Sequence, residues 1–352
     1  AAFETLTRLA REGNAVAQFY LGVMYYGGDG VQKDAAQAAA WFRKAAEQGL
    51  AGTQTILGTM YEKGQGVPQD YARAVMWYRK AAGQGVTEAQ YNLGQMYYDG
   101  RGVPQDYARA VMWYRKAAAQ GLAVAQYNLA LMYENGQGLP QSYAQAVTLY
   151  RKAAIQGLAD AQHNLGLMYK NGWGVPQDYA QAVTWYRNAA AQGNTFAQNS
   201  LGVMYAEGRG VSQDYAQAVE WYGKAAAQGN ASAQTNLGIM YYYGRGVPQD
   251  YAQAVTWYRK AAAQGDAAGQ LNLGMSYAEG QGIPQDYAVA YALFNVSASL
   301  DSSNNNPAAA LRSKVMASMT PEQVTAGQAL TREMQRVGVI KALDEYSNGG
   351  TQ

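Results

Sequence analysis

Carboxylates at a regular spacing are the first residues of this sequence that could do chemistry. Aspartates recur every 36 residues, and Glu62 precedes one of them, Asp70, closely enough for the two to act as a general acid and base. In the fourth copy, however, the aspartate is replaced by Ser142, which cannot serve as a catalytic carboxylate. Aspartate and serine both accept hydrogen bonds at helix N-termini, so we interpret the series as N-caps.

The other residue types that carry chemistry are sparse. The chain has no cysteine, which excludes thiol catalysis, thiolate metal ligands and disulfides. His163 is the one histidine, and a single imidazole without clustered carboxylates makes a poor metal site. No nucleophile-elbow, phosphate-loop or zinc-protease string is found, and the recurring Gly-x-Gly-Val lacks the third glycine of a dinucleotide fingerprint. We therefore expect no enzyme activity, cofactor or metal, and no catalytic residue.

Two helical patterns fill each 36-residue unit. In the copy at 86–121, apolar and small residues at three- and four-residue spacing predict a first helix, here called helix A. Gly100 suits a left-handed turn at its end, and Pro104 cannot continue it. A second helix, helix B, is expected to begin after Asp106. Such a unit cannot bury its apolar faces alone, so we predict a solenoid of stacked units.

Three motifs carry a resemblance to a known family. Ala-Gln-x-x-Leu-Gly-x-Met-Tyr lies in helix A, Gly-x-Gly-Val-Pro-Gln-Asp-Tyr-Ala joins the helices, and Ala-x-x-Trp-Tyr-Arg-Lys-Ala-Ala-x-Gln-Gly completes helix B. Over about 290 of its 352 residues, the chain resembles the Sel-one-like repeat (SLR) family of the tetratricopeptide-like superfamily. The resemblance implies an all-α, right-handed superhelical solenoid of eight 36-residue antiparallel helix pairs. It also implies A helices on the concave side and protein–protein contact as the function.

The two ends of the array are expected to differ from its units. We predict an N-terminal cap helix at 1–13, eight repeats at 14–301, and C-terminal capping helices with a frayed tail at 302–352. The last part is expected to hold a polar loop at 301–306, a helix at 307–319, a capping box at 320–323 that starts a helix to about Arg336, a short segment at 340–346, and a frayed end at 347–352.

Charge and hydropathy narrow the possible partners. The formal net charge is +2, and Arg–Lys pairs such as Arg115–Lys116 fall in the last turns of B helices, where they complement the helix dipole. We interpret these pairs as spaced capping charges and expect no nucleic-acid partner. No run of 18 apolar residues occurs, so no membrane span is expected.

Comparison of the repeats with one another separates packing positions from variable ones. A glycine such as Gly94 recurs inside helix A, although glycine there costs about 1 kcal/mol relative to alanine. We predict close approach to helix B at this position, with room for no more than the methyl group of Ala130. Tryptophans such as Trp113 recur on helix B, and we interpret this series as packing rather than as a binding site.

The variable positions fall on one stripe of helix A, opposite its predicted packed face. In the third repeat they are Glu88, Tyr91, Gln95 and Tyr98, at spacings of three and four residues. The stripe is rich in tyrosine, which is enriched at interface hot spots, whereas solvated faces are usually rich in lysine and glutamate. Along the array the stripe holds Phe19, Tyr26, Tyr91, Tyr98, Tyr127, Glu134, His163, Lys170, Asn199, Tyr242 and Leu271.

We predict that a protein partner binds centrally, in the third to fifth repeats. Trp173 supports this position, because it replaces a polar residue in the turn between the two helices of its repeat; local packing on the next unit is the alternative. The predicted contact residues are Tyr91, Tyr98, Tyr127, Glu134, His163, Lys170 and Trp173.

The resemblance implies two forms of this function. One is a bacterial immunity or inhibitor protein that neutralises a secreted toxin, for example a type VI phospholipase effector; the alternative is an adaptor or scaffold in envelope assembly or signalling. The chain starts at Ala1 without methionine, as it would after signal-peptide removal, although a trimmed chain would start in the same way. We therefore expect a periplasmic protein, with a cytoplasmic location as the alternative, that is monomeric alone.

Overall fold

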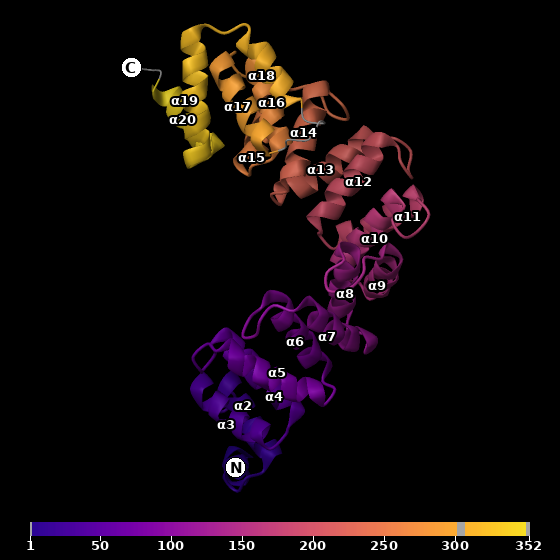
Figure 1. The fold of residues 1–352 in the computed structure, drawn as a ribbon, viewed down its shortest axis with the longest axis vertical. Helices are drawn as coiled ribbons and strands as arrows, with labels where there is room; N and C mark the ends of the chain where they lie inside the picture. The colour runs from indigo at the N-terminus through magenta and orange to yellow at the C-terminus, as the bar shows by residue number, and fades with distance from the viewer. Residues whose placement is uncertain (1, 301–306, 350–352) are drawn as a thin grey trace. The chain divides into compact units, whose positions relative to one another are not determined.

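The structure is a computed structural model that describes residues 2–300 and 307–349. These residues form helices and turns without a strand, and the helices follow one another in antiparallel pairs (Figure 1). The prediction of an all-α repeat solenoid is confirmed. The chain forms two compact halves, Ala1–Pro176 and Gln177–Gln352.

The A helices are α2 (Ala15–Gly27), α4 (Ala51–Lys63), α6 (Thr87–Asp99), α8 (Ala123–Asn135), α10 (Ala159–Asn171), α12 (Thr195–Glu207), α14 (Ala231–Tyr243) and α16 (Ala267–Glu279). The B helices are α3 (Ala35–Glu47), α5 (Tyr71–Gly83), α7 (Tyr107–Ala119), α9 (Tyr143–Ile155), α11 (Tyr179–Ala191), α13 (Tyr215–Ala227), α15 (Tyr251–Ala263) and α17 (Tyr287–Leu300). The remaining helices are α1 (Ala2–Arg11), α18 (Ala308–Met316), α19 (Pro321–Val337) and α20 (Val339–Gly349).

Each B helix begins at the predicted N-cap. The side chain of Asp106 accepts a hydrogen bond from the backbone N–H of Arg109 at 2.9 Å, and Ser142 does the same for Gln145 at 3.4 Å. The other aspartates of the series act in the same way: Asp34, Asp70, Asp178, Asp214, Asp250 and Asp286. The interpretation of the aspartates as N-caps is confirmed.

Two glycines end helix A, and each is needed for its own reason. Gly100 is the C-cap with a left-handed backbone (φ 70°), a conformation that glycine adopts without strain. At Gly102 a Cβ atom would lie 2.4 Å from the backbone carbonyl of Tyr71, in the preceding B helix. The turn therefore packs directly on the previous repeat, so the pattern Gly-x-Gly connects repeats as well as helices.

Within a repeat, the recurring helix A glycine receives an aromatic ring of helix B. A Cβ atom at Gly94 would lie 2.8 Å from Cδ1 of Tyr114, whose side chain is 1% exposed. The prediction of close approach is confirmed, with the tyrosine ring rather than the helix B backbone as the near neighbour. Ala130, in the fourth repeat, is itself fully buried beside a buried Tyr150.

Between repeats, a buried glutamine of helix A and an exposed glutamine at the end of helix B form a relay of hydrogen bonds. Gln90 of α6 donates to the carbonyl oxygen of Ala82, at the end of the preceding B helix, at 3.4 Å. Gln120, at the end of α7, donates to the side-chain oxygen of Gln90 at 2.8 Å and to the carbonyl of Gly85 at 3.0 Å. The first and second of these bonds recur with Gln18 and Gln48, Gln54 and Gln84, Gln126 and Gln156, Gln198 and Gln228, and Gln234 and Gln264.

The C-terminal helices cover the last repeat. Leu293 and Phe294, which replace the usual tryptophan and tyrosine, are 0% and 1% exposed and belong to one core with Leu330 and Met334 of α19. The capping box is present, because the Thr320 and Gln323 side chains and backbones bond reciprocally. The frayed end at 347–352 was predicted wrongly in part, because residues 347–349 belong to α20; residues 350–352 lie outside the described residues. The predicted loop at 301–306 lies outside the described residues.

The first prediction concerns the glycine pocket. Gly94→Leu should lower the free energy of unfolding by about 3 kcal/mol, since the side chain would overlap the buried Tyr114 ring. Gly94→Ala should change it by less than about 1 kcal/mol, because the helix-propensity gain offsets the smaller overlap. Urea denaturation followed by circular dichroism measures both. Equal stability of the two variants would contradict this account.

The second prediction concerns the relay. Gln120→Ala should lower the free energy of unfolding by about 1–3 kcal/mol, because it leaves the buried side-chain oxygen of Gln90 without its donor. Gln105→Ala is the matched control: Gln105 is exposed, as Gln120 is, but its bond to the carbonyl of Tyr98 is also exposed, so water can replace that bond. If the control variant loses as much unfolding free energy as Gln120→Ala, the relay contributes no more to stability than an exposed hydrogen bond does.

Candidate partner-binding face

The candidate face is the surface of the A helices in the N-terminal half, and buried tyrosines of the B helices form its floor. Tyr78, Tyr114 and Tyr150 are each at most 1% exposed, with their rings beneath helix A. Their hydroxyl groups reach the variable stripe and bond to its side chains, as set out below. Burial raises the pKa of each phenol above its ordinary value, so all three stay protonated and can donate.

In the second repeat the stripe is charged. The hydroxyl of Tyr78 donates to Glu62 at 2.6 Å and lies 3.1 Å from the hydroxyl of Thr59. Arg101, from the next repeat, approaches Glu62 at 3.4 Å and Asp99 at 2.5 Å. Glu62 is therefore committed to a tyrosine and an arginine, whereas Asp70 caps α5. These contacts give both carboxylates a structural role.

In the third repeat the predicted contact residues Tyr91 and Tyr98 are half-buried. The Tyr91 ring packs on Tyr114 at 5.7 Å between centroids, and its hydroxyl accepts from Asn128 of the next A helix at 3.3 Å. Tyr98 donates to Gln137 at 3.3 Å. Next to them lies a hollow of about 130 Å³, lined by Gln95, Tyr98, Tyr114, Asn128 and Leu131.

The fourth repeat repeats this arrangement with a carboxylate. The Tyr127 ring packs on Tyr150 at 5.8 Å, and the Tyr150 hydroxyl donates to Glu134 and accepts from Asn164 at 3.2 Å. Burial raises the pKa of Tyr127, and the negative charges of Asp160 and Glu134 add to the effect. Glu134 is thus half-buried with one oxygen held by the phenol.

In the fifth repeat the stripe carries His163 and Lys170. The Nδ1 atom of His163 lies 3.2 Å from the side-chain oxygen of Asn164. Partial burial lowers the pKa of His163, and the positive charge of Lys170 acts in the same direction, while Asn164 and Asp160 oppose it. The imidazole is therefore neutral at pH 7.

Trp173 stacks on the preceding repeat. Its ring lies 5.6 Å from that of Tyr143, at an interplanar angle of 21°, and the side chain is 41% exposed. In three other repeats an arginine takes this place over the equivalent tyrosine, as with Arg101 over Tyr71 at 5.7 Å. Trp173 therefore keeps a recurring contact, which runs back to the previous repeat instead of forward to the next.

The structure corrects the prediction that the stripe lies opposite the packed face. Three tyrosines of the stripe make packing contacts with helix B or with the next repeat, so each side chain is half-buried instead of fully exposed: Tyr91, Tyr98 and Tyr127. Among the A helices of the N-terminal half, the most exposed large apolar side chains lie on α2: Val16, Tyr20, Val23 and Tyr26 are 52%, 53%, 38% and 41% exposed.

A larger hollow lies between α2 and α4, in the first two repeats. Its volume is about 320 Å³, and its lining is mostly apolar: Val23, Tyr26, Phe42, Thr55, Ile56, Thr59, Met60 and Gln65. Sequence reasoning placed Tyr26 on the stripe but missed Tyr20. Its signal was visible, because most later repeats carry asparagine at this position, as at Asn92 and Asn128.

Among the described residues, no three histidine, aspartate or glutamate side chains come together to hold a metal ion. None of the described helices has the length and apolarity required to cross a membrane.

The fold and this face define an α-solenoid of helix pairs, a class of protein-interaction modules. The Sel1 repeat family matches residues 15–50, 53–86, 87–122, 123–158, 159–194, 195–230, 231–266 and 267–302. The chain belongs to the Sel1 repeat family. This agrees with the resemblance seen in the sequence, and the matched segments begin one to three residues after the predicted repeat starts.

Solved structures support this assignment. A Sel1 repeat protein from Oxalobacter formigenes is 37% identical, with a TM-score of 0.69, and the match covers 90% of each chain. A protective antigen of uropathogenic Escherichia coli strains, which displays an SLR fold, is 31% identical over 98% of this chain and 97% of its own, with a TM-score of 0.60. No curated protein matches significantly.

A more distant similarity carries no weight for function. The immunity protein Pa5087 from Pseudomonas aeruginosa is 22% identical, covers 61% of this chain and 81% of its own, and has a TM-score of 0.40.

The third prediction concerns His163. Because its pKa is lowered in the folded state, the unfolded chain binds the proton more tightly, and stability should fall as the pH drops from 7 through the ordinary histidine pKa near 6.5. Thermal melts at pH 7.0 and 5.5 should therefore differ less for His163→Gln than for the unaltered protein. The same melting-temperature difference in both proteins would refute this coupling.

Proposed function

We propose that the A-helix face of the N-terminal half binds a protein partner. The observation that carries this proposal is the row of exposed apolar side chains on α2, which continues into the hollow of about 320 Å³ between α2 and α4. Concave apolar surfaces with a few convergent polar groups are typical of binding sites. The proposed contact surface extends from α2 to α10.

The central part of this face supplies polar recognition. Tyr98, Glu134 and Lys170 each offer polar atoms at the rim of the stripe, and Tyr91 and Tyr127 offer ring edges that are already held in place by neighbouring rings. Side chains that are fixed before binding lose little conformational entropy on binding. His163, neutral at pH 7, and Trp173, with 41% of its surface exposed, complete the proposed central contacts.

The roles of the carboxylates support binding rather than catalysis. Glu62 and Glu134 are both held by buried phenols, and the aspartates of the recurring series cap helices. We therefore propose that the protein has no enzyme activity of its own and acts by contact.

The more specific proposal follows the family resemblance: the protein is an immunity protein that neutralises a secreted toxin, works in the periplasm and is monomeric alone. An adaptor or scaffold in envelope assembly is the second form. Co-expression with the product of a neighbouring gene separates them. Rescue of cells from a toxic neighbour supports the immunity role, and a complex with a non-toxic envelope protein supports the scaffold.

The fourth prediction tests the contact surface. Against the neighbouring-gene product, Tyr20→Asn and the double variant Tyr91→Ala/Tyr127→Ala should each weaken binding by about 2 kcal/mol, as loss of aromatic anchors does. Calorimetric titration measures the affinity. Tyr20→Asn should leave the melting temperature unchanged, whereas the double variant should also lower it, because both rings pack on buried tyrosines.

Trp173→Arg is the matched variant for the turn. Arginine keeps the contact with Tyr143, as Arg101 does with Tyr71, so the fold should be unaffected while the exposed indole surface is lost. Reduced affinity at an unchanged melting temperature supports a binding role. If Tyr20→Asn, Tyr91→Ala/Tyr127→Ala and Trp173→Arg all bind with full affinity, the A-helix face is not the binding surface.

A further inference from the structure

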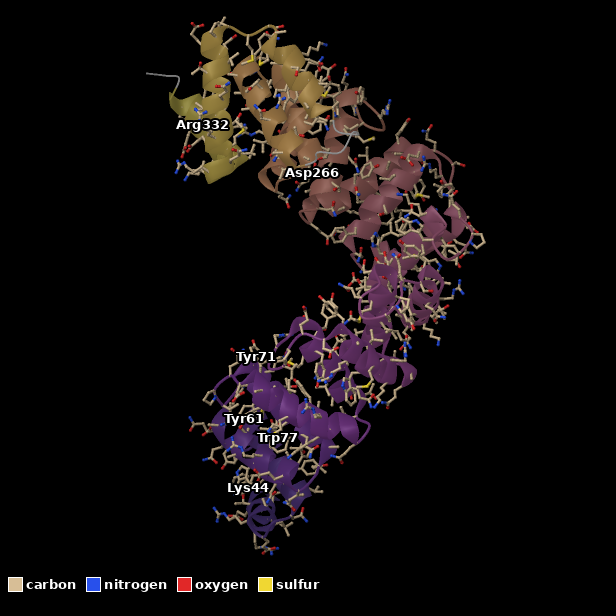
Figure 2. All side chains as sticks on the ribbon, in the orientation of Figure 1. Lys44, Tyr61, Tyr71, Trp77, Asp266 and Arg332 are labelled. Atoms are coloured by element: carbon tan, nitrogen blue, oxygen red, sulfur yellow. The ribbon has the colours of Figure 1, made fainter. Side chains whose placement is uncertain are left out.

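A second surface lies on the outer side of the B helices in the N-terminal half. The last turns of α3, α5, α7 and α9 each carry an exposed arginine–lysine pair. These pairs, here called the basic stripe, are Arg43–Lys44, Arg79–Lys80, Arg115–Lys116 and Arg151–Lys152. Figure 2 labels Lys44 on α3 and, beside the next pair, Trp77 on α5.

The arginines of the basic stripe bond to neutral partners. Arg79 donates to the hydroxyl of Tyr97, in the next repeat, at 3.0 Å. The same bond joins Arg43 to Tyr61, Arg115 to Tyr133 and Arg151 to Tyr169, at 2.8, 3.1 and 2.8 Å. A phenol holds the guanidinium in place without neutralising its charge, and the remaining N–H groups stay available for a carboxylate.

Most of the lysines are also placed against neutral groups. The ammonium of Lys80 lies 4.5 Å from the centre of the Trp77 ring, and Lys44 and Lys116 lie 4.2 and 4.4 Å from Trp41 and Trp113. Within the described residues, no arginine or lysine of the basic stripe forms a salt bridge. Glu47 is the one acidic residue in the last turns of these four helices.

The C-terminal half shows that the fold does not require this excess of charge. The position of the lysine is Asn188 in α11, and that of the arginine is Gly223 in α13. Of the cations that do occur there, Lys224 pairs with Glu220 at 2.7 Å and Arg259 with Asp344 at 2.6 Å. Arg187 instead donates to the hydroxyl of Tyr205, and Lys260 lies over the Trp257 ring. From the sequence alone, the arginine–lysine pairs are interpreted as charges that complement helix dipoles. That interpretation does not explain why the pairs of the N-terminal half lack salt-bridge partners among the described residues.

Apolar side chains alternate with the cations. Met76 and Met112, which lie one turn before their pairs, are 42% and 44% exposed, and Ile155, one turn after its pair, is 72% exposed. A phosphodiester backbone offers no counterpart to such apolar groups. Large aromatics can anchor a protein in a bilayer surface, but here Trp77 is only 5% exposed, and Trp41 and Trp113 are half-buried with a lysine over each ring. A protein segment that mixes carboxylates with apolar side chains matches both features.

We propose that the basic stripe binds an acidic, partly apolar segment of a protein, with glutamate or aspartate side chains on the arginine–lysine pairs and apolar side chains on Met76, Met112 and Ile155. This surface is separate from the A-helix face, so the protein can hold two partners, or two parts of one partner, at once.

The test uses a fluorescein-labelled peptide of repeated Glu-Glu-Leu and fluorescence anisotropy. Replacement of Lys44, Lys80, Lys116 and Lys152 together by glutamine should weaken binding about tenfold and flatten its dependence on salt, because these charges attract the peptide. The lysines are exposed, so the melting temperature should stay close to that of the unaltered protein. The matched control, Lys224→Gln/Lys260→Gln, removes two tryptophan-stacked lysines outside the stripe and should bind as the unaltered protein does.

Other peptides and variants in the same anisotropy assay test which chemical groups of the partner are recognised. A Gln-Gln-Leu peptide should not bind, and Met76→Ser/Met112→Ser should weaken the acidic peptide. Three outcomes overturn the proposal: no binding of the acidic peptide, an equal loss in the control variant, or tighter binding of single-stranded DNA or phosphatidylglycerol vesicles. Variants of the A-helix face such as Tyr20→Asn should not change this binding, so a failure here leaves the proposed function standing.

Discussion

Satisfaction of buried amide groups between repeats is the constraint on which the rest of the structure depends. Gln90 is 5% exposed and bonds both to the preceding B helix and to Gln120 at the end of its own repeat. An unsatisfied buried polar group costs roughly 1–3 kcal/mol, so each helix A is held at one depth between two B helices. The last repeat lacks this bond. Leu300 replaces the usual glutamine there, and the buried side-chain oxygen of Gln270 has no hydrogen-bond partner among the described residues.

That constraint also determines which side chains meet on the A-helix face. With the helices at fixed depth, the Tyr114 ring fills the space left by Gly94, and its hydroxyl emerges between neighbouring A helices. Stripe residues such as Tyr91 then pack on it and on Asn128 of the next repeat. The same side chains therefore contribute to stability and to the proposed recognition surface, so substitutions there are expected to act on both.

The A-helix face and the basic stripe differ in chemistry because the two helices of a repeat are buried to different extents. Helix A contacts neighbours on most of its circumference, which leaves a narrow stripe of aromatic and hydrogen-bonded groups. Helix B is exposed along a wider face, where Arg79 and Lys80 cover tyrosine and tryptophan with their aliphatic stems while their charges face water. In a repeat array such faces can vary without loss of stacking, because each repeat contacts only its neighbours.

The sequence by itself determined the repeat length, the helix pairs, the caps at Asp106 and Ser142, the glycine turns and the capping box at Thr320, because these depend on spacing and local hydrogen bonds. Only the tertiary structure decided how deeply the stripe is buried, that Trp173 stacks on Tyr143, and that the most exposed apolar side chains among the A helices of the N-terminal half lie on α2. The glutamine relay also became visible only there. Periodicity identifies one face of one helix, whereas burial depends on how closely a residue a full repeat away approaches it, and no local pattern encodes that distance.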